Sequence, residues 1–189
     1  MKRIITVIFF GILTYTVAQK SVCQNSLPRK GDLNVQNFFT GNWYVTHIKD
    51  GGKEAACREF KFRLDKSLVK LNADGQYTLN GQTKHYTTTC STTNGGSKGT
   101  DQYLLYCRHS YKDGSKDVNI FFDFGLTVID TDYTNYALVH RCTKYSSLDI
   151  NTGNLLLLQR NKNDNGSKAT ASLSKNKLSL GDFKKTSAC

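Results

Sequence analysis

The sequence predicts an all-β fold, an eight-stranded antiparallel up-and-down barrel closed by three disulfides and followed by a short C-terminal helix. Short runs of β-branched and aromatic residues recur along the chain, separated by polar turns rich in Gly, Asn and Asp. Helical periodicity is absent until the last residues. The single tryptophan, Trp43, follows a turn glycine at the start of the first run, where a large ring can plug the end of a closed sheet. A two-sheet sandwich is the alternative fold.

We expect strands at Asn42–Ile48, Cys57–Leu64, Leu68–Leu79, Lys84–Ser91, Asp101–His109, Val118–Ile129, Tyr136–Thr143 and Asn154–Arg160. The second strand alternates phenylalanine and leucine with basic residues, which indicates one solvent-facing side. The sixth is long for one strand, and Gly125 is the expected position of a bend. Apolar residues between Leu173 and Phe183 predict a short helix that packs on the outside. A barrel of eight strands has room for one small ligand, so the fold favours binding.

The first 18 residues have the composition of a secretory signal peptide. Lys2 and Arg3 precede an apolar run that is too short to span a bilayer comfortably, and small residues end it at Ala18. We expect cleavage after Ala18, so that residues 19–189 form one secreted, extracellular domain. Asn165-Gly166-Ser167 is a glycosylation sequon in a polar loop after the last strand.

The chain is strongly basic, with a formal net charge of +11. The lysines and arginines are spread along it, which fits a solvated basic surface, or a surface or cavity that attracts anions. No nucleic-acid-binding motif is present, so DNA and RNA are not expected partners. The sequence also lacks a nucleophile motif, a metal-ligand spacing and a phosphate-binding glycine loop, which argues against an enzyme and against a metal site.

Six cysteines in an exported chain predict three disulfides. Cys90 and Cys107 flank a turn signal at Asn94-Gly95-Gly96, so they can face each other across a hairpin. Closing this loop would stabilise the fold by roughly 3 kcal/mol. The residues by themselves leave the pairing of the other four cysteines open.

Two segments resemble the lipocalin signatures: Gly41-Asn42-Trp43, and the turn Thr131-Asp132-Tyr133-Thr134-Asn135-Tyr136. Together with the runs 39–47 and 137–142 and the terminal Cys189, they are similar to salivary lipocalins of blood-feeding triatomine bugs, the group of the nitrophorins and the triabin- and pallidipin-like proteins. The resemblance implies the pairs Cys23–Cys142 and Cys57–Cys189. It also implies a saliva protein that interferes with host haemostasis.

The resemblance does not extend to the haem site of the nitrophorins. Those proteins place a histidine ligand just before an Asn-Ala pair, whereas Lys70 and Leu71 precede Asn72-Ala73 here. A protonated lysine is a poor iron ligand. We therefore expect no cofactor, with His47 as the only plausible substitute ligand, because strand alternation places it on the same face as Trp43.

Strand alternation also predicts which residues face the cavity. If Cys142 points outward, Arg141 points inward. A buried arginine either pairs with a nearby carboxylate or carbonyl, or it offers a fork of donors to a phosphate or carboxylate. The predicted ligand-binding residues are Trp43, Val45, His47, Lys70, Leu126, Val128, Arg141, Leu155 and Leu157.

An amphipathic anion suits such an apolar cup with a few donors. ADP or another adenine nucleotide is the first candidate, with its base stacked on Tyr or Trp and its phosphates held by Lys70 and Arg141, which would make the protein a platelet aggregation inhibitor. An eicosanoid acid is second. A biogenic amine would need inward carboxylates, for which Asp130 and Asp132 are the only obvious candidates. The alternative class is a surface-acting anticoagulant that coats anionic phospholipid or binds a clotting factor. In either class we expect a monomer.

Overall fold

The computed structural model describes residues 28–50, 58–79, 82–92, 102–145, 147 and 150–186, without the side chains of 76–79, 82–84 and 150. The expected signal peptide, Cys23, Cys57 and Cys189 lie outside the described residues. Cys142 is disulfide-bonded, but the two pairs implied by the resemblance cannot be traced within the described part of the chain. No helix in that part is long and apolar enough to cross a membrane.

The elements in chain order are α1 (Val35–Phe38), β1 (Gly41–Lys49), β2 (Arg58–Asp65), β3 (Leu68–Leu79), β4 (Gln82–Ser91), β5 (Tyr103–Asp113), β6 (Lys116–Thr131), β7 (Tyr136–Tyr145), β8 (Ile150–Gln159), η1 (Ser167–Ala169), α2 (Thr170–Lys175), η2 (Leu180–Asp182) and β9 (Lys184–Lys185). Each of β2 to β8 pairs antiparallel with the next, β8 pairs with β1, and β1 pairs with β2, which closes the sheet. The predicted eight-stranded barrel is confirmed, and the sandwich is not formed. The short β9 adds to β1 beyond the region paired with β2.

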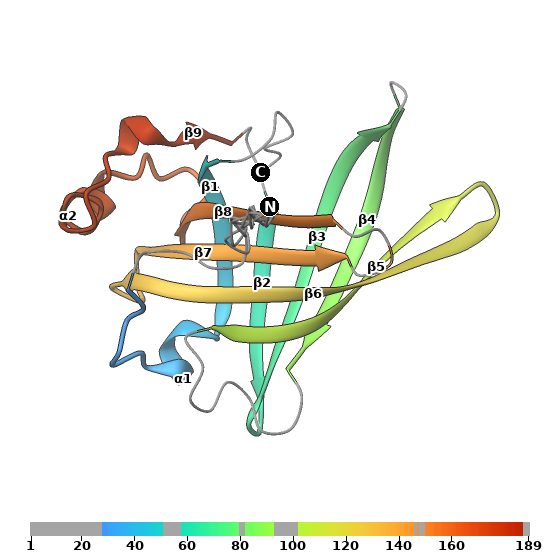
Figure 1. Ribbon diagram of the computed structural model, residues 1–189, viewed down its shortest axis with the longest axis horizontal. Helices are drawn as coiled ribbons and strands as arrows, with labels where there is room; N and C mark the ends of the chain where they lie inside the picture. Colours follow the sequence, from blue (N-terminus) through green and yellow to red (C-terminus); the bar gives the residue numbers. More distant parts are fainter. Residues whose placement is uncertain are drawn as a thin grey trace, which may run out of the picture.

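The β5–β6 hairpin is longer than the pattern predicts and extends past its neighbours (Figure 1). No bulge occurs at Gly125, where the sequence predicts a bend. Gly125 pairs in regular register with both Leu104 and Cys142, and the irregularity in β6 lies between Val128 and Asp130. A Cβ at Gly125 would lie 2.4 Å from the Gln102 side chain, so the glycine makes room for that side chain.

Trp43 closes one end of the barrel, as predicted. Its Nε1–H donates to the Phe38 carbonyl at 3.0 Å, and the Arg160 guanidinium lies 3.7 Å from the centre of its ring. The Asn34 side chain caps α1, which carries Phe38 into the same cluster. Arg160 also donates to four backbone carbonyls of the chain around this end, those of Asn37, Thr40, Asn42 and Tyr133. The barrel end with Trp43 is therefore closed by aromatic packing and by the hydrogen bonds of Arg160.

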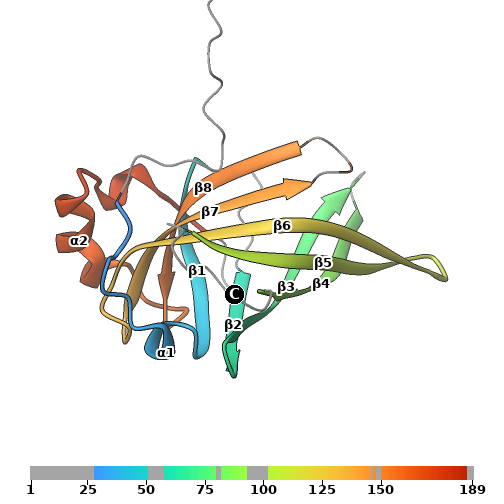
Figure 2. The same cartoon turned by 60° about the horizontal axis from the view of Figure 1, so that its bottom comes forward.

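A second apolar core lies outside the barrel wall. It joins Leu155 and Leu157 of β8 to Leu173 of α2 and Phe183. The predicted C-terminal helix is confirmed as the six-residue α2, which lies at the opposite end of the molecule from the β5–β6 hairpin (Figures 1 and 2). Because this segment covers β8, that strand is buried on both faces.

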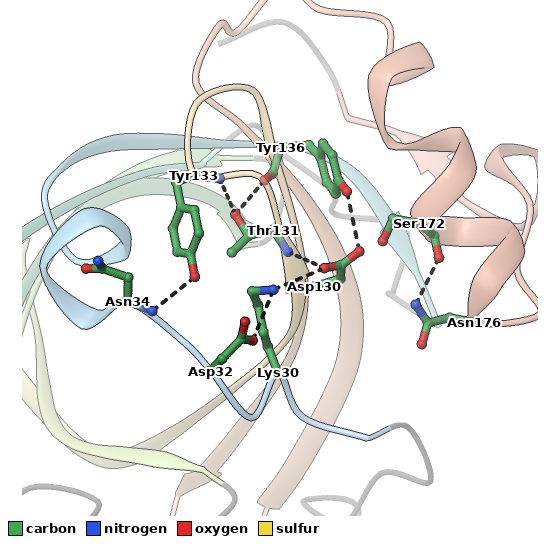
Figure 3. Close-up of polar contacts among 9 residues, drawn as sticks. All are labelled: Lys30, Asp32, Asn34, Asp130, Thr131, Tyr133, Tyr136, Ser172 and Asn176. Atoms are coloured by element: carbon green, nitrogen blue, oxygen red, sulfur yellow. Dashed lines mark hydrogen bonds and ion pairs between the residues drawn. The ribbon is translucent and has the colours of Figure 1, made fainter.

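The N-terminal arm is held against the end of β6 by polar contacts (Figure 3). The Lys30 ammonium lies 3.3 Å from Asp32 and 3.9 Å from Asp130, and its backbone N–H donates to the Val128 carbonyl. The Tyr136 hydroxyl donates to Asp130 at 3.4 Å. These contacts hold Asp130 outside the barrel, near α2.

Candidate functional site

The barrel interior contains a cavity of about 40 Å³. It lies in the half of the barrel away from Trp43, towards the ends of β2 and β7 where Arg58 and Tyr145 stand. Its lining residues are Arg58, Phe60, Leu71, Ala73, Asp74, Tyr86, Thr88, Cys90, His109, Phe122, Phe124, Arg141, Thr143 and Tyr145. Aromatic and aliphatic side chains dominate, with two arginines, a histidine and two phenols among them. A space of this size holds ordered water, and a larger guest requires lining side chains to move.

Arg141 is the unusual group in this cavity. It faces inward, as predicted, between Val139 and Thr143 on β7. Burial, and secondly the charge of Arg58, lower the pKa of its guanidinium to about 10, so the group stays positively charged at neutral pH. Among the described residues no carboxylate or carbonyl pairs with it, and its Nε is buried without a hydrogen-bond partner. A partly desolvated charge without a counter-ion is costly, and an anion is the chemical group that would compensate it.

His109 connects three elements of the cavity wall. Its Nδ1 lies 2.6 Å from the Thr88 hydroxyl, and its Nε2 lies 3.0 Å from the Tyr145 hydroxyl. The ring packs against Phe122 and Tyr86, with centroid distances of 4.2 and 4.7 Å. Burial, followed by the positive charges of Arg58 and Arg141, lowers the pKa of the ring to about 4. His109 is therefore neutral at pH 7 and can donate only one N–H.

A larger hollow of about 550 Å³ lies on the outer side of β5 and β6, next to Ser147. The neighbouring Leu104, Tyr106 and Phe121 are 43, 53 and 68% exposed. This surface is open to solvent and lacks a buried charged group. It suits contact with another surface better than enclosure of a small molecule.

Four of the predicted ligand-binding residues face inward but lie in the packed part of the core, where Trp43, Val45, Leu126 and Val128 are buried. None of them lines the cavity. Of the nine predicted residues, the structure brings only Arg141 to the cavity wall.

The predicted inward orientation of His47, Leu155 and Leu157 is wrong. A register shift between Val45 and His47 reverses the alternation along β1, so Ile48 joins the inner core and His47 lies outside, near Gly166. Leu155 and Leu157 belong to the outer core with α2, while Leu156 and Leu158 face inward. Both faces of β8 are buried, so all four residues from 155 to 158 are leucine. The sequence therefore does not indicate which of them face the barrel interior. His47 is therefore not placed to bind a haem inside the barrel.

Lys70 is also misplaced by the prediction. Its neighbours Val69 and Leu71 belong to the inner core, so Lys70 points outward, where it pairs with the Asp65 carboxylate. It cannot hold a phosphate inside the cavity from this position. The expected pairing of Cys90 with Cys107 is confirmed: the two residues lie opposite each other on β4 and β5 and are bonded.

Sequence reasoning missed most of the polar lining, Arg58, Tyr86, Thr88, His109 and Tyr145. Strand alternation contained a usable signal. Once Cys90 and Cys107 are placed inside, a period of two along β4 and β5 also places Tyr86, Thr88 and His109 inside, and the same step from Arg141 reaches Tyr145.

Neither of the two candidate carboxylates for an amine faces the cavity. Asp130 is held by the N-terminal arm, and Asp132 accepts from the backbone N–H groups of Thr134, Asn135 and Tyr136. Asp74 is the one carboxylate among the described lining residues, and its side chain is exposed at the end of the cavity. Within the described chain no group of three or more His, Cys, Asp or Glu side chains could hold a metal ion.

The family profile described as Triabin matches residues 16–173 of this sequence. The chain belongs to the triabin family. Triabin-family relatives from triatomine bugs include Triafestin-1 of Triatoma infestans, 34% identical over 97% of this chain and 90% of its own, and Pallidipin of Meccus pallidipennis, 31% identical over 97 and 94%.

Solved structures with the same lipocalin barrel include a variant of the LTBP1 protein in complex with leukotriene C4. It is 25% identical over 85% of this chain and 91% of that one, with a TM-score of 0.58. A biogenic amine-binding protein, 24% identical over 85% of both chains with a TM-score of 0.62, shares the fold.

Proposed function

We propose that this triabin-family protein is a secreted salivary binding protein, not an enzyme, that impairs host haemostasis by sequestering a small amphipathic anion in the inner cavity. The observation that carries the proposal is the charge of Arg141, whose partly buried side chain lines an apolar and aromatic cavity, with its Nε enclosed and without a hydrogen-bond partner among the described residues. An anionic headgroup would supply the missing partner, and an apolar body would fit against the phenylalanine and leucine walls.

Within this class the geometry favours an eicosanoid acid over ADP, which reverses the order expected from the sequence. Lys70, the second expected phosphate ligand, lies on the outer face. The cavity base beside Phe60, Leu71 and Phe122 is apolar. A single carboxylate on an apolar chain matches this distribution better than a diphosphate does. The LTBP1 structure holds leukotriene C4, an eicosanoid acid that also carries a charged peptide group, which supports an eicosanoid as the class of ligand.

Titration calorimetry on the mature chain tests the proposal, with leukotriene C4, ADP and serotonin as probes. We expect saturable binding of leukotriene C4, weaker or no binding of ADP, and no binding of serotonin. Arg141→Gln should weaken leukotriene C4 binding by about tenfold to a hundredfold, because a hydrogen-bonded charge contact is lost. Lys70→Gln is the matched control, since it removes a positive charge from the outer face and should leave the affinity unchanged. Equal losses in both variants would show that only the overall charge matters.

The second candidate function is contact with anionic phospholipid through the outer face of β5 and β6. The exposed Leu104, Tyr106 and Phe121 beside the outer hollow favour it, as does the basic charge of the chain. Co-sedimentation with phosphatidylserine vesicles distinguishes the two. Phe121→Ser should abolish sedimentation if the surface acts, whereas Arg141→Gln should abolish small-ligand uptake if the cavity acts.

The processing of the chain is part of the same proposal. We expect cleavage after Ala18, secretion as a monomer, the pairs Cys23–Cys142 and Cys57–Cys189, and no bound haem. Asn165 is exposed in the loop before η1 and is available for glycosylation. Intact-mass and peptide mapping of the secreted protein, with an absorption spectrum, checks each of these expectations.

A further inference from the structure

The cavity contains a chain of three hydrogen-bonding side chains that the anion proposal does not by itself require. It runs from the Thr88 hydroxyl on β4 through the His109 ring on β5 to the Tyr145 hydroxyl on β7. All three groups line the same cavity as Arg141. Because Thr88 and Tyr145 each lie within hydrogen-bond distance of one nitrogen of His109, the proton positions in the two hydrogen bonds are coupled through the ring.

The surroundings of Thr88 decide which group donates in each of these two hydrogen bonds. Its side chain is buried, and within the described part of the protein its hydroxyl makes one hydrogen bond, to Nδ1 of His109. A buried hydroxyl proton without an acceptor is costly. The Thr88 hydroxyl therefore donates to Nδ1, which must then be the unprotonated nitrogen of a neutral ring.

The second half of the chain follows from the first. Nε2 carries the single ring proton and donates it to the oxygen of Tyr145. The hydroxyl proton of Tyr145 is then not used by His109 and is free to point into the cavity. Close by, the charge of Arg141 acts on the same phenol, so any acceptor that reaches Arg141 also lies near this proton.

We propose that His109, protonated on Nε2 and oriented by Thr88, holds the Tyr145 hydroxyl as a hydrogen-bond donor into the cavity, so that the site selects an oxyanion headgroup. Tyr145 is the specificity-determining residue, and His109 and Thr88 are positioning residues that act through it. The inference rests on the proposed function and adds the reason why a neutral or cationic headgroup is rejected: Arg141 and Tyr145 both present donors.

The groups around His109 keep this arrangement over a wide pH range. The charged and titratable residues that share its cavity are Arg58 of β2, Asp74 of β3, whose side chain is exposed at the cavity end, Tyr86 of β4, and Arg141 and Tyr145 of β7. Two positive charges near the ring, together with its burial, keep His109 neutral until the solution is strongly acidic. The direction of the chain should therefore not change between pH 6 and 8.

The first test is independent of any ligand. Long-range proton–nitrogen NMR spectra of the ¹⁵N-labelled mature chain at pH 7 should show His109 with a pyridine-like Nδ1 and a pyrrole-like Nε2. In Thr88→Val the donor to Nδ1 is lost, so the population of the Nε2–H form should fall while the fold is retained. An Nδ1–H tautomer or an imidazolium in the unaltered protein would overturn the inference.

The second test measures headgroup selection with cis-parinaric acid and its methyl ester as fluorescent probes. The unaltered protein should bind the acid at least about tenfold more tightly than the ester, and Tyr145→Phe should reduce that preference by about tenfold by weakening acid binding alone. The control Tyr44→Phe removes a phenol from the outer side of β1, between the inward Trp43 and Val45 and away from both hollows, and should change neither affinity.

The outcomes separate the two proposals. If Arg141→Gln weakens acid binding and Tyr145→Phe does not, the anion proposal stands and the role of Tyr145 is refuted. If Tyr145→Phe weakens acid and ester equally, Tyr145 acts only by packing, and headgroup selection is refuted. Failure of the unaltered protein to bind either probe would refute both the selection and the cavity function.

Discussion

Gly75 shows how a missing side chain shapes the cavity. It pairs across the β3–β4 ladder with Tyr86, and a Cβ on Gly75 would lie 2.4 Å from the Tyr86 hydroxyl oxygen and 2.5 Å from its Cζ. The aromatic ring therefore lies over the backbone of the glycine. From this position it also packs against His109. The absence of a side chain at Gly75 is therefore what allows the Tyr86 ring to lie in this position on the cavity wall.

Gly75→Ala should displace the Tyr86 ring. The clash involves a ring and not the end of a flexible chain, so we expect a loss of about 1–3 kcal/mol in unfolding free energy, as for other overpacked sites. Urea unfolding of the single variant measures this loss. In a Tyr86→Leu background the same change should cost much less, and an equal cost in both backgrounds would show that the ring is not the source of the strain.

The polar chain of Thr88, His109 and Tyr145 illustrates a different point at the residue scale. Each of these residue types is ordinary in a β-strand, and none marks a site in the sequence by itself. They are recognisable as a group only from the two hydrogen-bond distances that join Thr88 to His109 and His109 to Tyr145. The inward direction of Arg141, by contrast, was predictable from strand alternation once Cys142 was taken to point outward.

At the scale of elements, β8 and α2 form the second core that the barrel pattern did not predict in detail. Leu173 of α2 is fully buried and packs in the cluster with Leu155 and Leu157. This contact covers the outer face of β8. It also fixes the C-terminal segment against the barrel wall.

Leu173→Ala should lower the unfolding free energy by about 2–5 kcal/mol, because it leaves a cavity in this outer core. Leu104→Ala, at a side chain that is 43% exposed on β5, is the matched control and should stay within about 0.5 kcal/mol of the unaltered protein. Thermal unfolding by circular dichroism compares the two. Ligand binding in Leu173→Ala should persist below its melting temperature, since the inner cavity lies on the other side of the wall.

At the scale of the whole molecule, burial affects three of the histidines in the same way. The pKa values of His47, His109 and His140 are all lowered, with burial as the largest cause in each, and that of His109 falls to about 4. Below a pH of about 6.5 the unfolded chain binds protons at these rings that the folded protein does not. Stability should therefore fall as the pH drops from 7 towards 4.

Urea unfolding at pH 7.0, 6.0, 5.0 and 4.0 measures this dependence. His109→Gln should flatten the profile by up to about 2 kcal/mol between pH 7 and 4, a value reduced from the full linkage because the ring is only partly buried. The control His85→Gln changes an exposed residue and should leave the slope unaltered. A profile as steep in His109→Gln as in the unaltered protein would assign the acid sensitivity to other groups.

The features predictable from the sequence are those that depend on short-range patterns. The eight strands, the plug at Trp43, the Cys90–Cys107 pair and the inward direction of Arg141 follow from turn residues and from an alternation of two along a strand. Family resemblance agrees with the Triabin match on the same chain. Each of these features depends on residues that are close in the sequence or that face each other across one hairpin.

Only the tertiary structure decided which residues make the site. A register shift in β1 turned His47 outward, and the packing of α2 turned Leu155 and Leu157 from expected cavity walls into an outer core. The cavity itself brings together side chains from β2 to β7. Alternation along a strand is set by the local backbone, whereas a bulge, a covering helix and a shared cavity depend on contacts between residues far apart in the chain. The sequence by itself therefore determined the barrel, and long-range packing decided what the barrel can hold.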